Sequence, residues 1–385
     1  MRGISLYVHI PFCAARCPYC DFATAPATSA LRARYLDALV AEIAREGALL
    51  GRPRVRTIYV GGGTPSLLEP DEVGRLARAL AEAFTVRPRE VTVEANPATL
   101  DRARLEAWRA FGVTRLSLGA QSFSGRGLRA LGRTHQPDDV APAVDAGRSV
   151  GLRVSLDLIF GWPGQTPAEW RADLGAAISL GVDHLSCYPL ELELTREDAV
   201  ANWPGGGWPT LARWRAATAA TQPDDRAIAV LYAMAHRHLA RAGYRHYEIA
   251  NWARPGSRSL HNAVYWRSGE WLGVGAGAHS HLAGARSHQP AALPAYIERV
   301  ERALGRIADA AGDPAAEEAM LRLRLDTGID IGRSAARWGT PASARIRGAL
   351  VTSARRGLIR WSGERATLTP RGRILANEVF VRLLP

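Results

Sequence analysis

The sequence predicts an α/β protein, with an open, partial (β/α)6 barrel followed by a smaller C-terminal module of helices and a hairpin. The first observation is an alternation of β-rich and helical runs, about six times over residues 1–195, which is typical of a parallel sheet with helical crossovers. The second is that six units are fewer than the eight of a closed barrel. The third is that polar and glycine-rich residues follow five strands at their carboxyl ends, where such folds place their chemistry.

The elements of this first region follow in order. A short apolar strand leads into the stretch YVHIPFCAARCPYCDF at 7–22. β-Branched and apolar runs predict the further strands Thr57–Val60, Val91–Ala95, Arg115–Leu118, Arg153–Phe160 and His184–Leu190. Apolar residues at helical spacing predict the helices Leu31–Leu50, Asp71–Phe84, Leu100–Phe111, Val140–Val150 and Ala168–Leu180.

The periodicity weakens after residue 195. Residues 196–310 are expected to form an irregular loop and a connecting region, with one helix over Arg226–Ala242. After a linker near Ala308–Pro314, residues 315–385 form the smaller module. Helices and a hairpin are predicted there, and this combination resembles a winged helix: Glu317–Leu325, Ala342–Arg355, the hairpin 358–368, and Pro370–Leu384 capped by Thr369. A lid or docking module fits it better than DNA binding.

Composition excludes several classes of protein. The formal net charge is +12, but the chain has no lysine, and its arginines are scattered through alanine-rich helices rather than gathered in a basic stripe with aromatics. We therefore expect no nucleic-acid partner. There is no basic and apolar leader and no run of eighteen apolar residues, so we expect a cytoplasmic protein, in a compartment that keeps thiols reduced.

Three cysteines are the most informative local feature. Cys13, Cys17 and Cys20 fall within eight residues, so one loop can turn all three thiols toward one ion or cluster. A Cys-x3-Cys-x2-Cys triplet without a fourth local thiol favours a [4Fe–4S] cluster whose fourth iron keeps an open coordination position. A zinc site completed by His9 and inert cysteines are the alternatives. Cys187 lies in an apolar run and is expected to be a core residue.

Together these residues resemble the radical S-adenosylmethionine superfamily, through the cysteine loop followed by GGGTP at 61–65. Over almost the whole chain the sequence is similar to the oxygen-independent coproporphyrinogen III oxidase family, and within it to the heme chaperone branch, HemW. The further segments that carry the similarity are ExNP at 94–97, SLGAQSF at 117–123, GRTH at 132–135, DLIFGWPGQT at 157–166, HNAVYW at 261–266, GAGAHS at 275–280 and LTPRGRILANEVF at 368–380.

The resemblance implies a radical-SAM barrel and a role for each matching residue. The three cysteines would hold the cluster, and the amine and carboxylate of S-adenosylmethionine (SAM) would chelate the open iron. Residues that would contact or adjoin SAM are Tyr7, Gly62, Gly63, Thr64, Glu94, Gln121, Arg133 and Asp157. Helix capping by Glu94 and a surface ion pair of Arg133 are the structural alternatives.

Two departures from the oxidase branch favour the chaperone branch. The oxidase motif has a fourth cysteine where this chain has Phe22, and it has an N-terminal extension, whereas this sequence begins six residues before Tyr7. Membership of the chaperone branch implies that heme is bound and passed to heme-accepting proteins, membrane-associated acceptors included. His261 is then the candidate heme ligand, unless it is held within a loop.

The alternative functions are oxidative decarboxylation of coproporphyrinogen III and another radical SAM reaction on a tetrapyrrole. The tryptophan-rich stretch Trp203–Trp214 is expected to form part of a flap over the heme or the acceptor surface.

Overall fold

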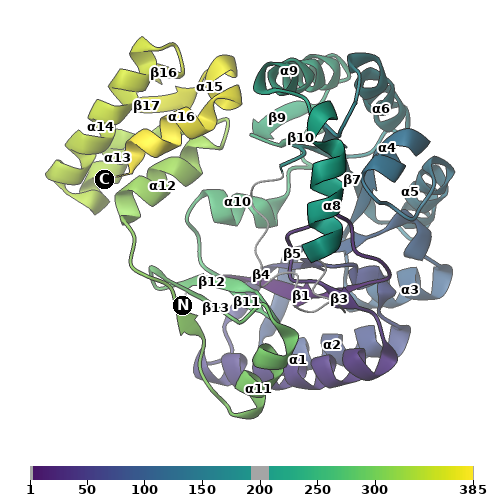
Figure 1. The fold of residues 1–385 in the computed structure, drawn as a ribbon. Helices are drawn as coiled ribbons and strands as arrows, with labels where there is room; N and C mark the ends of the chain where they lie inside the picture. The colour runs from purple at the N-terminus through teal and green to yellow at the C-terminus, as the bar shows by residue number, and fades with distance from the viewer. Residues whose placement is uncertain (1–2, 192–207, 385) are drawn as a thin grey trace.

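The computed structural model describes residues 3–191 and 208–384, and its main element is a twelve-stranded sheet. The strand order is β14-β13-β12-β11-β1-β4-β5-β6-β7-β8-β10-β9. The six predicted strands are neighbours and run parallel: β1 (Ile4–Ile10), β4 (Arg54–Gly62), β5 (Thr85–Ala95), β6 (Arg115–Gln121), β7 (Arg153–Phe160) and β8 (His184–Pro189). Because β14 and β9 are separate edges, this part of the chain forms an open, partial barrel, as predicted (Figure 1).

Helices connect these strands as the alternation predicts. They are α1 (Ser29–Leu49), α2 (Pro70–Ala83), α3 (Arg102–Phe111), α4 (Gly125–Ala130), α5 (Val140–Ser149) and α6 (Pro167–Ser179). The start of α6 shows how the sequence sets a helix boundary. Thr166 Oγ1 accepts from Glu169 N at 3.2 Å, and the Glu169 carboxylate accepts from Thr166 N at 2.8 Å, which forms a capping box.

The region after β8 is more regular than the sequence suggests. We predicted an irregular connection over 196–310, but from residue 208 onward it supplies four helices and six strands of the main sheet. These are α8 (Trp208–Thr218), α9 (Asp225–Arg241), β9 (Arg245–Glu248), β10 (Asn251–Ala253), α10 (Leu260–Trp266), β11 (Trp271–Val274), β12 (His279–Leu282), β13 (Ala285–His288), α11 (Leu293–Glu301) and β14 (Ile307–Ala308). The strands are two to four residues long, too short for a clear alternation.

The C-terminal module has its own three-stranded sheet and its own apolar core. The elements are α12 (Pro314–Leu323), β15 (Ile329–Asp330), α13 (Ile331–Trp338), α14 (Thr340–Arg355), β16 (Ile359–Ser362), β17 (Arg365–Leu368), α15 (Pro370–Ile374) and α16 (Ala376–Phe380). The predicted hairpin is β16–β17. The single C-terminal helix predicted from Pro370 is instead broken at Leu375 into α15 and α16.

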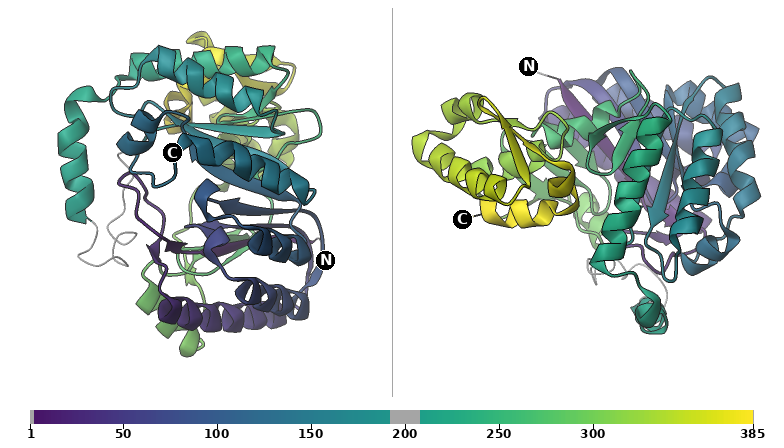
Figure 2. Two further views of the ribbon diagram at one scale, coloured as in Figure 1. Left: turned by 90° about the vertical axis from the view of Figure 1, so that its right-hand side faces the viewer. Right: turned by 90° about the horizontal axis from the view of Figure 1, so that it is seen from above.

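Two separate clusters of buried side chains support the two parts of the chain. One fills the barrel between the sheet and helices α1, α2, α3, α5, α6, α9 and α11, and the other lies within 315–383. Figure 2 shows the C-terminal module, in yellow, on the opposite side of the sheet from the blue helices of the barrel. No helix within residues 3–191 and 208–384 is both long and apolar enough to cross a bilayer.

Candidate functional site

The cysteine loop is closed at its base by backbone pairing. Strand β2 (Phe12–Cys13) runs parallel to β3 (Ala25–Pro26), and Ala25 N donates to Pro11 O at 2.8 Å. Cys20 N donates to Cys17 O at 3.2 Å, which makes a turn between these two cysteines. None of the three loop cysteines forms a disulfide. The loop therefore presents three reduced thiols from one short segment.

One cavity of about 540 Å³ is lined by nearly all of the residues predicted to bind the cluster or SAM. The three cysteines line it from the loop, and the other wall is formed by the carboxyl ends of parallel strands. The predicted residues that line it are Cys13, Cys17, Cys20, Gly62, Gly63, Thr64, Glu94, Gln121, Arg133 and Asp157. Tyr7 and His261 lie outside it.

The glycines at the end of β4 are required by the close passage of two chain segments. Gly62 has φ of +115°, and a Cβ there would lie 2.4 Å from the imidazole of His9. A Cβ on Gly63 would lie 2.7 Å from Phe12 O. Gly63 N donates to Ile10 O at 2.8 Å, so the glycine run follows the start of the cysteine loop. Glycine lets the backbone approach both this loop and a ligand.

Hydrogen-bond donors point at two of the cysteine sulfurs. Thr64 Oγ1 donates to Cys13 Sγ at 3.6 Å, and Arg133 Nη1 donates to Cys17 Sγ at 3.4 Å. Burial raises the pKa of the Cys13 thiol to about 11, so it is a neutral thiol when no metal is bound. Donors to sulfur and a positive guanidinium favour the negative charge of metal-bound thiolates. This donor set fits an iron–sulfur cluster.

Arg133 is half-buried, and one of its nitrogens lacks a hydrogen-bond partner within the described residues. Its Nη2 donates to Gly119 O at 3.1 Å, but within the described residues its buried Nε has no hydrogen-bond partner. Gln121 ends β6 with φ of +61°, and its amide nitrogen lies 2.8 Å from the position of a Cβ on Gly119. Buried donors without a partner are rare in proteins, so a polar ligand is expected beside Arg133.

Two carboxylates, Glu94 near the end of β5 and Asp157 within β7, complete the polar wall. Glu94 accepts from Tyr59 Oη at 2.7 Å and from Gly62 N at 2.9 Å, and burial raises its pKa to about 7. Asp157 accepts from Ser117 Oγ at 3.0 Å, and burial raises its pKa as well. Such groups suit the hydroxyls and the amine of a nucleoside amino acid. Tyr59 and Ser117 were not predicted, because they read as ordinary strand residues.

Tyr7 and His9 line a second cavity, of about 390 Å³. Tyr7 Oη lies 3.0 Å from His9 Nδ1, and His9 Nε2 lies 2.8 Å from Ala23 O. The Tyr7 ring is stacked on Tyr59 with centroids 6.2 Å apart. Tyr7 thus adjoins the first cavity through Tyr59 rather than lining it.

His261, the predicted heme ligand, is fully buried at the start of α10. Its Nδ1 lies 2.8 Å from Thr57 Oγ1, and its Nε2 lies 2.7 Å from Tyr265 Oη. Burial lowers its pKa from 6.5 to about 3. In this arrangement both ring nitrogens are engaged within the protein, so His261 holds α10 against β4.

The buried imidazole gives a testable pH dependence. Because the folded pKa of His261 is depressed, its contribution to stability is complete above the unfolded pKa of 6.5 and is lost as the pH falls toward 3. Relative to neutral pH, the stability lost by pH 5 through protonation of His261 in the unfolded chain is about 2 kcal/mol. We expect the free energy of unfolding of wild type to fall between pH 7.5 and pH 5 by about 2 kcal/mol more than that of His261→Gln, as measured by urea denaturation. Equal pH dependence of the two proteins would show that the imidazole titrates freely.

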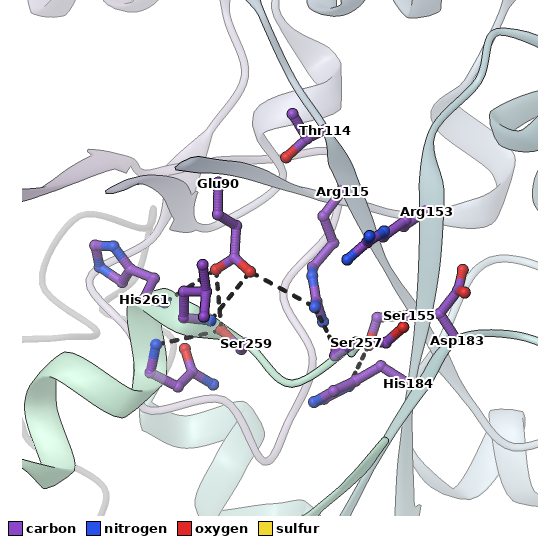
Figure 3. A network of polar contacts seen from close by, with 12 residues as sticks. Glu90, Thr114, Arg115, Arg153, Ser155, Asp183, His184, Ser257, Ser259 and His261 are labelled. Atoms are coloured by element: carbon purple, nitrogen blue, oxygen red, sulfur yellow. Dashed lines mark hydrogen bonds and ion pairs between the residues drawn. The ribbon is translucent and has the colours of Figure 1, made fainter. Parts of the chain in front are cut away.

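A buried ion pair anchors the same helix and was not predicted. Glu90, on β5, accepts from the backbone nitrogens of His261 at 2.9 Å and Leu260 at 3.0 Å (Figure 3). Its Oε2 lies 3.6 Å from Arg115 Nη2, and both side chains are buried. The carboxylate therefore neutralises the amino end of α10 and the guanidinium together.

The tryptophan-rich stretch is only partly described. Residues 203–207 lie outside the described residues, so the predicted flap is not tested. Trp214, on α8, donates from Nε1 to Ala130 O at 3.0 Å, which joins this helix to the end of α4.

Comparisons with known proteins show which families this chain resembles. The Radical SAM superfamily matches residues 7–176, and the HemN C-terminal domain matches residues 311–375. A curated heme chaperone HemW of Mycobacterium tuberculosis is 36% identical over all of this chain and 95% of its own length. HemW of Bacillus subtilis is 33% identical over 98% of each chain.

A solved structure extends the comparison to three dimensions. The coproporphyrinogen III oxidase HemN of Escherichia coli, described as a radical SAM enzyme, superimposes with a TM-score of 0.83 at 25% identity, over 99% of this chain and 90% of its own. Identity above 30% along the whole length, with three cysteines on one cavity wall, assigns the family. The chain belongs to the HemW heme chaperone family of radical SAM proteins.

Proposed function

We propose that this protein binds heme and transfers it to heme-accepting proteins, on a radical SAM scaffold that carries a [4Fe–4S] cluster and SAM. The observation that carries the proposal is the full-length similarity to proteins named as heme chaperones. Phe22 supports it, since this position, two residues after Cys20, holds a fourth cysteine in the oxidase motif.

Different residues of the large cavity would bind the cluster and SAM. Cys13, Cys17 and Cys20 would hold three irons, and a bound cluster supplies an open iron and a redox centre. Thr64 and Arg133 stabilise negative charge on the sulfurs. The polar contacts to SAM would come from Gly62, Gly63, Glu94, Gln121, Arg133 and Asp157, which surround the same cavity.

The proposal extends to the heme acceptors, the cellular location and the domain boundaries. The acceptors would include membrane-associated proteins, and the location would be cytoplasmic, where thiols stay reduced. The chain would divide into residues 1–195, 196–310 and 315–385. The separate core of the last part supports that boundary.

The decisive experiment compares heme binding with enzyme turnover on anaerobically reconstituted protein. We expect hemin titration to saturate at about one heme per chain, which the Soret absorbance reports, and we expect no catalytic formation of protoporphyrinogen from coproporphyrinogen III with SAM and reductant. Turnover at catalytic rates would instead assign the chain as an oxidase. Absence of saturable heme binding would contradict the chaperone function.

A further inference from the structure

The large cavity extends beyond the residues that are predicted to bind the cluster and SAM. Along β6 it is lined by Arg115, Ser117, Gly119 and Gln121, which are two residues apart and therefore share one face of the strand. Gln121 ends β6 and Arg115 begins it, about 20 Å away, because a strand rises about 3.3 Å per residue. The cavity thus has an outer end at the cysteine loop and an inner end at Arg115.

The inner end is built by the barrel, by α10 and by the C-terminal module together. Its lining residues lie near the amino ends of three parallel strands, around the start of α10 and after α12. They are Arg115 of β6, Ser155 of β7, His184 of β8, Ser259 and Asn262 around α10, and Arg324. None of these six residues is among those predicted to contact SAM, so the inner end has no assigned ligand.

Arg115 brings a buried positive charge to the inner end. Its side chain is 4% exposed, its Nη2 donates to Ser257 O at 2.5 Å, and Nη2 lies 3.6 Å from Glu90 Oε2 (Figure 3). Its buried Nε has no hydrogen-bond partner among residues 3–191 and 208–384. Buried donors without a partner are rare, so we expect a ligand that accepts a hydrogen bond beside Arg115.

Arg324 adds a second guanidinium group, from the C-terminal module. It directly follows α12, and its guanidinium carbon lies 4.5 Å from the centroid of the Trp266 ring. In the part of the chain that the structure describes, its buried Nε also lacks a hydrogen-bond partner. The segment after it is fixed to the barrel, since Asp326 N donates to Tyr247 O at 2.9 Å. Arg324 is therefore held at the cavity wall.

The other titratable groups around the inner end leave these positive charges only partly compensated. His184 has both ring nitrogens paired, with Nδ1 2.7 Å from Ser155 Oγ and Nε2 2.8 Å from Tyr247 Oη. Burial lowers the pKa of His184, so its imidazole is neutral. Burial raises the pKa of Asp157, which lines the same cavity, and that of Glu248, which interacts with Arg324. An anionic ligand is favoured here.

A carboxylate is the anion that these donors suit best. Guanidinium groups pair with carboxylates through several charge-assisted hydrogen bonds, and the Asn262 amide adds a further polar group at the same end. Heme carries two propionate carboxylates on a flat, apolar ring. Toward the carboxyl ends of the strands, the cavity wall carries the side chains of Tyr59, Ile159 and Tyr188, which suit such a ring.

From these observations we propose that the inner end of the large cavity binds the propionate groups of heme, through Arg115 and Arg324. The inference rests on the proposed heme-binding function and assigns the site of the heme carboxylates. Arg115 belongs to the barrel and Arg324 to the C-terminal module, so a bound heme would connect the two parts of the chain.

The test compares hemin with hemin dimethyl ester, whose esterified propionates carry no charge. Both are titrated into the full chain in the same dilute detergent, and Soret absorbance reports binding. We expect wild type to bind hemin at least tenfold more tightly than the ester. Arg324→Met keeps an apolar contact with Trp266 but removes the charge. It should weaken hemin binding at least tenfold and leave ester binding unchanged, whereas a merely structural role of Arg324 would weaken both.

Matched variants complete the test. Arg355 is an exposed arginine at the end of α14 that lines neither cavity, so Arg355→Met should bind both ligands like wild type. Arg115 is tested in the double variant Glu90→Gln and Arg115→Met, which leaves no unpaired buried charge. The double variant should lose the preference for hemin over the ester, and Glu90→Gln alone should keep it. Circular dichroism checks that each variant is folded.

The outcomes separate this inference from the proposed function. If wild type binds no heme, the proposed function itself fails. If wild type binds hemin and the ester equally, or if Arg324→Met keeps the preference for hemin, the function stands and the propionate site is wrong. SAM binding to the reconstituted protein is measured in parallel by equilibrium dialysis. A loss of SAM binding in Arg324→Met with an unchanged preference for hemin would assign the inner end to SAM and overturn the inference.

Discussion

Replacing Cys13, Cys17 and Cys20 together with serine should abolish the iron–sulfur cluster. Serine keeps the size of the side chain but removes the thiolate that iron requires, and the three thiols come from one loop that has no nearby replacement among the described residues. After anaerobic reconstitution, we expect iron and sulfide to fall from about four each per chain to background. The broad visible absorbance of the cluster should disappear as well.

Cys187 provides the matched control for this experiment. It is buried on β8 within the barrel core, and it does not line the large cavity. Cys187→Ala should therefore keep the full cluster, while circular dichroism confirms that the triple variant is folded. Retention of iron and of the visible band by the triple variant would refute the cluster assignment.

The barrel was predictable because the sequence patterns that indicate its strands, turns and helices are local. Each unit carries its own strand, turn and helix pattern, and parallel strands bring their carboxyl ends to one edge whatever the rest of the chain does. The predicted cluster and SAM residues come from different strands and the loops that follow them, yet all except Tyr7 line one cavity. Tyr7 lies within β1 and pairs in register with Tyr59 of β4, so the two side chains share one face of the sheet, and the stacked Tyr59 ring lines the first cavity while Tyr7 lines the second.

The other parts depend on pairings between distant residues, which local patterns do not encode. Strand β11 lies parallel to β1 although more than 250 residues separate them in the sequence. The burial of His261 could not be read from its motif, because the partners of its ring, Thr57 and Tyr265, include a residue of β4. From the sequence alone, Glu90 would be expected to be a solvent-exposed charge on a strand, yet it is buried against Arg115 and α10.

Glu90→Ala should be the most destabilising single substitution among the charged residues discussed. It leaves Arg115 buried without its carboxylate, and it removes the acceptor for the backbone nitrogens of Leu260 and His261. Breaking a buried ion pair by removing one partner costs about 3–5 kcal/mol. Because typical proteins are stable by only about 5–15 kcal/mol, urea denaturation should show a large fall in midpoint.

Two further variants show whether the loss comes from this pairing. Glu90→Gln keeps one carbonyl oxygen for the amino end of α10 but loses the charge, so its stability should fall between that of wild type and Glu90→Ala. Glu82→Ala removes an exposed carboxylate from α2 and should change stability by less than about 0.5 kcal/mol. If Glu90→Ala lowered the free energy of unfolding as little as Glu82→Ala, the folded protein would tolerate a buried Arg115 without its carboxylate partner. Because the Glu90 carboxylate pairs with both Arg115 and the first backbone nitrogens of α10, that result would also mean that other contacts hold the amino end of α10.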